Sequence, residues 1–297
     1  MTRWLVTGAG GMLGRDLMSL FTARGEEITG LTRDDLDITD TAAVLAGLQA
    51  AKPDVVVNCA AWTAVDEAES HEDAALAVNG HAVAGLAAAC ADSGAVLVQV
   101  STDYVFDGLA SSPYVESAVP APRTAYGRTK LAGEQAVLGT LPEAGYVVRT
   151  AWLYGAHGPN FVHTMIRLAR SGACPAVVDD QRGQPTWSAD VARQIHALIT
   201  SRAPAGVYHA TSTGETTWFG LAGEVFALFD AAGFAGREMA RPAPVPTTSA
   251  AYQRPAPRPA YSVLGHDAWV SAGIAPIGHW REALHRAFPE MLAAENN

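Results

Sequence analysis

The stretch TGAGGMLG, residues 7–14, lies between an apolar run, RWLVTG, and a segment with the apolar periodicity of a helix, MLGRDLMSLFTARG. Three of its glycines, Gly8, Gly11 and Gly14, have the spacing G-x-x-G-x-x-G. In such a loop the first glycine permits a tight turn, the second lets a pyrophosphate approach the backbone, and the third lets the helix pack on the strand. The N-terminus of the helix offers free N–H groups to the phosphates. We predict a dinucleotide-binding loop with these contacts: Gly8, Gly10, Gly11, Met12, Leu13 and Gly14.

Strand-like and helical segments alternate outward from this loop. Apolar or β-branched runs favour strands at 26–32, 54–61, 95–102 and 145–152, and helical patterns occupy 41–53, 71–94 and the segment after Ala125. Such alternation is typical of a parallel sheet with right-handed crossovers. We therefore predict an α/β fold, a Rossmann-like doubly wound parallel sheet, with an NADP-binding domain over residues 1–150.

The alternation loosens beyond residue 150. Helices are expected at 162–172, 188–201, 216–233 and 279–292, and short strands at 175–180 and 206–211. We expect segments within about 175–211 to return to the Rossmann domain, and residues 151–174 and 212–297 to form a smaller C-terminal sugar-nucleotide-binding domain. The Pro-rich stretch 241–262 fits a disordered linker and a folded loop near a ligand equally well.

Composition narrows the classes of partner and compartment. The chain has 297 residues and a formal net charge of −10, without a run rich in Lys or Arg. This balance argues against nucleic acid or an anionic membrane as the main partner. No apolar run approaches the roughly 18 residues of a membrane span. Three cysteines without metal-type spacing, and an N-terminus that enters a strand directly, predict a cytoplasmic protein without a targeting segment.

The end of the second expected strand bears on the choice of cofactor. In NAD-selective sites a carboxylate there holds the ribose 2′-hydroxyl, but here the strand ends with Thr32 and Arg33. Arg33 can pair with a 2′-phosphate, which favours NADPH. Asp34 and Asp35 follow directly, so NADH stays a possible cofactor.

The segment AYGRTK, residues 125–130, places Tyr126 and Lys130 one helical turn apart. An unperturbed tyrosine has a pKa of about 10, and a neighbouring ammonium stabilises the phenolate and lowers that pKa toward the range of an acid–base catalyst. A surface helix also produces this spacing, so the pair alone does not establish a site. The preceding strand ends at Thr102, at the edge of the sheet where ligands bind in such folds.

Thr102, Tyr126 and Lys130 are spaced like the Ser/Thr–Tyr–Lys triad of extended short-chain dehydrogenases/reductases. Further strings narrow the resemblance: LDITD (36–40), NCAAWTAVDEAE (58–69), STDYVFDG (101–108), RTAWLYG (149–155), VDDQRGQPT (178–186) and RPAYSVL (258–264). In this combination and order the sequence resembles the dTDP-4-dehydrorhamnose reductase family over nearly its whole length.

The resemblance implies reduction of the 4-keto group of a dTDP-4-keto-6-deoxy sugar by NADPH, from dTDP-4-dehydrorhamnose to dTDP-L-rhamnose. A ketone that receives hydride builds negative charge on oxygen, so the site needs a proton donor and hydrogen bonds aimed at that oxygen. Tyr126 would supply the proton and Thr102 would hydrogen-bond the oxygen. Lys130 would lower the tyrosine pKa and hold the nicotinamide ribose.

The resemblance also implies contacts at the remaining matching positions. On the cofactor side these are Asp37 and Ile38 near the adenine, and Ala61, Trp62 and Thr63 after the third strand. On the substrate side they are Asp103 and Trp152 at the sugar, with Asn160, Gln181, Arg182 and Arg258 at the diphosphate and base. Asp37 fits equally well as the cap of helix 41–53, and Trp152 as a core residue. Trp62 departs from the family pattern, in which a smaller ring often precedes the threonine.

Enteric members of the family pair subunits through a metal held by acidic side chains, and only Asp16 stands out here as a counterpart. We therefore predict no metal requirement and a possible homodimer. Related activities stay open. A dehydratase needs a carboxylate where this chain has Tyr104, whereas an epimerase, a reductase of another 4-keto sugar such as a dihydrostreptose precursor, and a non-catalytic NADP-binding regulatory subunit share the fold.

Overall fold

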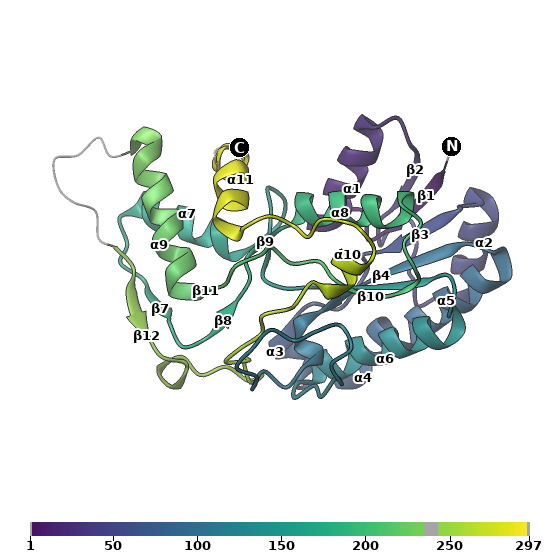
Figure 1. The fold of residues 1–297 in the computed structure, drawn as a ribbon, viewed down its shortest axis with the longest axis horizontal. Helices are drawn as coiled ribbons and strands as arrows, with labels where there is room; N and C mark the ends of the chain where they lie inside the picture. The colour runs from purple at the N-terminus through teal and green to yellow at the C-terminus, as the bar shows by residue number, and fades with distance from the viewer. Residues whose placement is uncertain (1, 235–242, 296–297) are drawn as a thin grey trace.

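The computed structural model describes residues 2–234 and 243–295 (Figure 1). Six parallel strands form its main sheet. In spatial order they are β10 (Gly206–His209), β5 (Gly145–Thr150), β4 (Val96–Thr102), β3 (Val55–Asn58), β1 (Arg3–Thr7) and β2 (Glu27–Leu31). The chain order reverses between β1 and β3, which is the doubly wound arrangement. The predicted α/β fold with a parallel central sheet is confirmed.

Helices cover both faces of this sheet (Figure 1). One face carries α1 (Met12–Ala23) and α8 (Ser188–Thr200), and the other carries α2 (Thr41–Ala51), α5 (Ala82–Ser93) and α6 (Ala125–Thr140). The strands alternate accordingly: in β1, Trp4 and Val6 belong to the core under α1 and α8, whereas Leu5 belongs to the opposite core. Both faces are therefore buried, as a parallel sheet requires.

The segment expected as one helix at 71–94 is divided into three parts. These are α4 (Glu72–Leu76), a π-helical segment η1 (Ala77–His81) and α5. Among the described residues, Glu72–Ser93 is the helix whose length and apolar composition suit a membrane span, although the sequence shows no continuous apolar run there. Half of its most apolar window is buried in the structure, where α5 packs against α2 and α6.

The part of the chain beyond β5 has its own apolar core. Helices α7 (Phe161–Ser171), α9 (Trp218–Phe229) and α11 (Trp280–Ala294) pack together around it. Short strands pair beside them: β6 (Leu153–Tyr154) with β9 (Thr186–Trp187), β8 (Arg182–Gly183) with β11 (Thr216–Thr217), and β7 (Ala176–Val178) with β12 (Val245–Thr247). The remaining elements are α3 (Val65–Ala68), η2 (Asp103–Val105), η3 (Asp230–Phe234), η4 (Ser249–Ala251) and α10 (Asp267–Ser271).

Two expectations for this region need correction. The helix expected at 216–233 begins only at Trp218, because the two threonines before it form β11 and the second caps the helix through its side chain. The Pro-rich stretch is not a linker where it is described, since β12 pairs in parallel with β7 and η4 follows. The first two residues of that stretch, 241 and 242, lie outside the described residues.

Candidate active site

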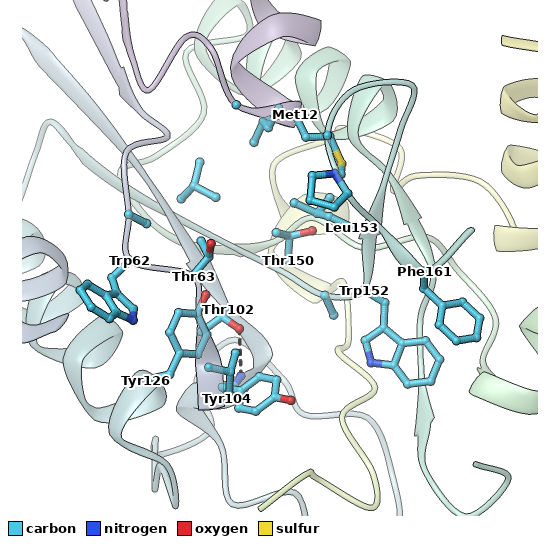
Figure 2. Close-up of a pocket in the computed structure, with 18 of the residues that line it drawn as sticks. Met12, Trp62, Thr63, Thr102, Tyr104, Tyr126, Thr150, Trp152, Leu153 and Phe161 are labelled. Carbon is cyan, nitrogen blue, oxygen red and sulfur yellow. Dashed lines mark hydrogen bonds between the residues drawn. The ribbon is translucent and has the colours of Figure 1, made fainter. Parts of the chain in front are cut away.

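A cavity of about 1430 Å³ opens at the carboxyl ends of the parallel strands. Its wall runs from the glycine loop through Thr102, Tyr126 and Lys130 to Trp152 and Arg258, residues that come from both parts of the chain. Sites for one small ligand usually measure about 300–1,000 Å³. The cavity therefore has room for a dinucleotide and a second ligand side by side, and Figure 2 shows its central part.

The glycine loop has the geometry that the spacing predicts. Gly8 has φ +66°, and a Cβ there would lie 2.6 Å from the backbone nitrogen of Ala60 at the end of the neighbouring strand. Gly11 is the N-cap of α1. Because glycine has no side chain, no cap occupies the first backbone N–H groups of the helix, which lie at the cavity wall. All six predicted loop residues lie on the cavity wall.

The loop after β2 brings Arg33 to the same wall, where its side chain is exposed. The carboxylate of Asp35 is used locally, since it accepts hydrogen bonds from the Thr32 backbone N–H at 2.9 Å and the Thr32 hydroxyl at 2.7 Å. These bonds lower the pKa of Asp35. The guanidinium, rather than this carboxylate, is thus available to a ligand at the end of β2.

Asp37 and Ile38 also line the cavity. Asp37 accepts hydrogen bonds from the Thr39 backbone N–H and hydroxyl, which lower its pKa. The alternative reading, in which Asp37 caps the following helix, is wrong. That cap is Asp40, whose side chain accepts hydrogen bonds from the backbone N–H groups of Ala42 and Ala43.

Ala61, Trp62 and Thr63 form the wall after β3. Their backbone is held by Asn79, a buried residue of η1 that the sequence did not single out. Its carboxamide accepts from the Trp62 N–H at 2.9 Å and donates to the Trp62 carbonyl at 3.0 Å. A second donation, to the Thr129 hydroxyl at 3.1 Å, connects this loop to α6. A polar residue within the apolar stretch ALAVNGHAVAG was the available signal.

The three residues of the predicted triad all line the cavity, and Figure 2 shows Thr102 and Tyr126 next to each other. Thr102 ends β4, and its hydroxyl donates to Asp103 at 3.0 Å and accepts from the Tyr104 backbone N–H at 3.2 Å. The same hydroxyl lies beside the Tyr126 phenol and opposes the rise in its pKa. Lys130 is 4% exposed and donates from Nζ to the Val100 carbonyl at 2.6 Å.

Gly127, next to the tyrosine, sets how closely α6 approaches the end of β4. A Cβ at this position would lie 2.1 Å from the Tyr104 carbonyl oxygen. The Tyr104 and Tyr126 rings then meet edge to face, with centroids 5.7 Å apart. Sequence reasoning missed Gly127, although it stands inside the Tyr-x-x-x-Lys motif.

The electrostatic expectation for Tyr126 is wrong for this state of the protein. Burial raises its pKa to about 12, and Lys130 does not lower it. The physical reason is that the amine is turned to the Val100 carbonyl while the phenol is desolvated. Burial also lowers the pKa of Lys130 to about 8, against the opposing effect of Glu134.

Asp103 is a buried carboxyl beside the triad. Burial raises its pKa to about 6, although the Thr102 hydroxyl donates a hydrogen bond to it. It lies on the cavity wall, as predicted for a sugar contact. Its proton can therefore be exchanged near neutral pH.

An aromatic group forms the far wall. Trp152 has φ +48° and stacks on Trp218 with ring centroids 3.6 Å apart and planes 8° apart. The Phe161 ring packs on the Trp218 ring, with centroids 4.7 Å apart. Trp218 donates from its indole nitrogen to Gln181 at 3.1 Å, which holds the predicted glutamine on the wall. Trp218 was missed because the sequence shows it only as the start of an amphipathic helix.

Arg258 reaches the cavity from the Pro-rich loop. It pairs with Asp66 of α3 at 2.9 Å, and the same carboxylate accepts from the Ala256 backbone N–H at 3.2 Å. The loop is thereby fastened across the cavity mouth to the Rossmann part of the chain.

Two predicted substrate contacts are not brought to the cavity wall. Asn160 caps α7, accepting from the His163 N–H at 3.0 Å and donating to the Gly155 carbonyl at 2.9 Å. Arg182 points to the surface and pairs with Glu215 at 2.6 Å. Among residues 2–234 and 243–295, no group of three or more His, Cys, Asp or Glu side chains is placed to hold a metal ion.

The fold and the site together define a class. A doubly wound parallel sheet, a glycine loop after β1 and a Tyr-x-x-x-Lys helix on one cavity are the features of an extended short-chain dehydrogenase/reductase that uses a nicotinamide dinucleotide.

The sequence matches the family described as the RmlD substrate binding domain over residues 2–293, and the chain belongs to this family of dTDP-4-dehydrorhamnose reductases. It is 56% identical to a dTDP-4-dehydrorhamnose reductase of Streptomyces griseus, over 97% of this chain and 94% of the relative. It is 53% identical to a dTDP-4-keto-6-deoxy-D-glucose reductase of Streptomyces niveus, over 99% of each chain.

A solved structure gives the same result for the fold. The dTDP-4-dehydrorhamnose reductase of Bacillus anthracis, in complex with NADP, superposes with a TM-score of 0.91 at 36% identity, over 97% of this chain and 99% of that one. The chain is accordingly an NADP-dependent oxidoreductase of the dTDP-4-dehydrorhamnose reductase type.

Proposed function

We propose that this chain reduces the 4-keto group of dTDP-4-dehydrorhamnose with NADPH and forms dTDP-L-rhamnose. The observation that carries the proposal is the meeting of Thr102, Tyr126 and Lys130 with the glycine loop on one cavity that has room for two ligands. The cradle at Gly8, the free helix N-terminus after it and the available guanidinium of Arg33 fit a dinucleotide with a 2′-phosphate.

When bound, NADPH supplies the hydride. The protein's part is the other half of the reaction. As the C4=O π bond breaks, its electron pair moves to oxygen, and Tyr126 donates its phenolic proton to that oxygen. The Thr102 hydroxyl, which lies beside the phenol, would hold the oxygen within reach. The Lys130 ammonium, which donates to the Val100 carbonyl in this structure, would stabilise the phenolate that is left if it turned toward the phenol, and it would hold the nicotinamide ribose.

The proposal extends to the rest of the site. Asp37, Ile38, Ala61, Trp62 and Thr63 would contact the cofactor, and all five lie on the wall. Asp103, Trp152, Gln181 and Arg258 would contact the dTDP-sugar from the opposite side, where they also lie on the wall. Asn160 and Arg182 would act on the nucleotide only if their present partners, Gly155 and Glu215, release them.

We also propose the division of labour between the parts. Residues 1–150, with returning segments within about 175–211, would bind NADP, and residues 151–174 and 212–297 would bind the sugar nucleotide. Two features support this. Strand β10 adds to the edge of the main sheet, and α7, α9 and α11 share a separate core.

The decisive assay supplies NADPH with dTDP-4-dehydrorhamnose and follows the loss of reduced-nicotinamide absorbance. Tyr126→Phe keeps the ring but removes the proton, so we expect turnover to fall by about 10²- to 10⁴-fold, with NADPH affinity preserved. Loss of NADPH binding in this variant would instead indicate that the hydroxyl is needed to bind the cofactor. Full activity would rule out Tyr126 as the proton donor.

A second candidate is reduction of a related dTDP-4-keto-6-deoxy sugar. The Streptomyces niveus relative, at 53% identity against 56% for the first, bears the name of such an enzyme. Parallel assays with both keto-sugars, and the C4 configuration of each product by NMR coupling constants, separate the two. A specificity constant at least tenfold higher for the second sugar would favour this candidate.

A further inference from the structure

Helix α6 continues past the catalytic pair to a third buried residue on the same face. Tyr126, Lys130 and Glu134 are successive i, i+4 positions, and Glu134 is 1% exposed. A carboxylate that is shielded from water needs hydrogen-bond partners. The partners of Glu134 lie on strands β4 and β5, which end at the active site.

Arg149 of β5 binds the Glu134 carboxylate with two parallel hydrogen bonds, from Nε at 2.9 Å and from Nη2 at 2.7 Å. The hydroxyl of Ser101 of β4 donates to the same carboxylate at 2.5 Å. Ser101 and Arg149 are register partners in the sheet, and the next pair is Thr102 with Thr150. Glu134 therefore fastens the helix that carries the phenol and the amine to the strand end that carries the threonine.

The surroundings hold Arg149 firmly on this carboxylate. Its guanidinium lies 5.0 Å from the Phe106 ring centroid and 3.3 Å from Nε2 of His209. Burial and the guanidinium lower the pKa of His209 to about 3, so this imidazole is neutral and accepts. The cluster thus contains two buried cations, Arg149 and Lys130, and a single anion, Glu134.

The charged and titratable groups that act on Lys130 come from two elements. Glu134 on its own helix favours the ammonium. Cys59 after β3 lies nearby, but burial raises the pKa of its thiol to about 12, so it stays neutral and adds no charge. Desolvation by the surrounding protein favours the neutral amine. Glu134 is thus the carboxylate that opposes deprotonation of the lysine.

We propose that Glu134 is a positioning residue for the reduction: it aligns Tyr126 and Lys130 with Thr102 through Arg149 and Ser101, and it keeps the lysine charged. This rests on the proposed function for the alignment and on the NADP-dependent class for the charge. Glu134 is not among the residues that line the cavity, and it acts through its neighbours.

The test measures the NADPH dissociation constant against pH, which needs no sugar. Affinity should weaken as Lys130 loses its proton, near pH 8 in the parent protein. In Glu134→Gln we expect this transition to move down by about one pH unit, since one nearby opposite charge is lost. Ser101→Ala is the matched control, because it removes a hydrogen bond from the carboxylate but leaves the charge. It should keep the transition in place.

Glu134→Gln leaves Arg149 buried without its anion, and folding is checked by circular dichroism. Should the single variant not fold, Glu134→Gln/Arg149→Met removes both charges of the pair, and a smaller downward shift is expected, because loss of the guanidinium's repulsion offsets part of the lost attraction. An unchanged transition in the folded single or double variant overturns the proposal. If the parent reduces no dTDP-4-keto sugar, the proposed function fails, while the binding titration still decides the role of Glu134.

Discussion

At the scale of single residues, the site shows groups whose ordinary pKa values are shifted in opposite directions. Burial raises the pKa of Tyr126 to about 12 and of Asp103 to about 6, and it lowers that of Lys130 to about 8. Each shift disfavours the charged form, as desolvation requires. The free site therefore holds a phenol that keeps its proton at neutral pH.

The lysine shift sets a pH limit on cofactor binding. Lys130 is charged below about pH 8 and neutral above it, so NADPH should bind more weakly as pH rises through this value. A hydrogen bond from a charged donor is worth roughly 1 kcal/mol more than a neutral one, which corresponds to about a fivefold change in dissociation constant. Fluorescence titration of NADPH between pH 6 and 10 measures this change in the dissociation constant. Lys130→Met should bind weakly at every pH, and a pH-dependent loss that persists in this variant would point to another group.

At the scale of elements, α6 fixes the positions of Tyr126 and Lys130 relative to Thr102 at the end of β4. Its N-terminus is capped by Thr124, whose side chain accepts from the Gly127 N–H at 3.0 Å, and this first turn lies directly against the Tyr104 backbone. Close backbone approach at this point leaves no room for a side chain.

Two alanine substitutions on α6 separate this fit from helix propensity. Gly127→Ala would place its methyl group 2.1 Å from the Tyr104 carbonyl, whereas a Cβ at Gly139 meets nothing within 4 Å. We expect Gly127→Ala to lose at least tenfold in kcat, because the phenol is displaced from the ketone oxygen. Gly139→Ala should gain about 0.5–1 kcal/mol of stability with normal kcat. The free energy of unfolding in urea and steady-state kinetics measure the two effects, and equal kcat in both variants would contradict the fit.

At the scale of the whole molecule, the cavity depends on contacts between segments far apart in the chain. The Asp66–Arg258 pair joins α3 to the Pro-rich loop, and the carboxylate also holds the Ala256 backbone. Two attachment points on one carboxylate keep the loop at the cavity before any ligand arrives.

Asp66→Asn should therefore raise KM for the sugar nucleotide several-fold, because the loop must be ordered on binding, while kcat stays within about twofold. The control is Asp54→Asn, which breaks the more exposed Arg3–Asp54 pair on the far side of the sheet. Initial-rate measurements on both variants make the comparison. A KM equal to that of the control would mean that the loop needs no such attachment.

Much of this architecture follows from local pattern. The glycine loop, the alternation of strands and helices and the Tyr-x-x-x-Lys spacing each report on a few adjacent residues, and they predicted the sheet and the centre of the site. What they missed depends on contacts over long sequence distances. Asn79 reaches Trp62, Trp218 meets Trp152, and Arg182 finds Glu215 rather than the cavity. The pKa of Tyr126 was misjudged for the same reason, since burial is a property of the assembled fold.

The paired indoles of Trp152 and Trp218 give the protein an optical property of its own. Two nearly parallel indoles this close couple their electronic transitions, so the pair absorbs left- and right-circularly polarised light unequally. Both rings line the cavity, and Trp152 has a positive φ of +48°, so a ligand that moves either ring alters the coupling. The enzyme thus contains a label-free spectroscopic reporter of occupancy that works without turnover.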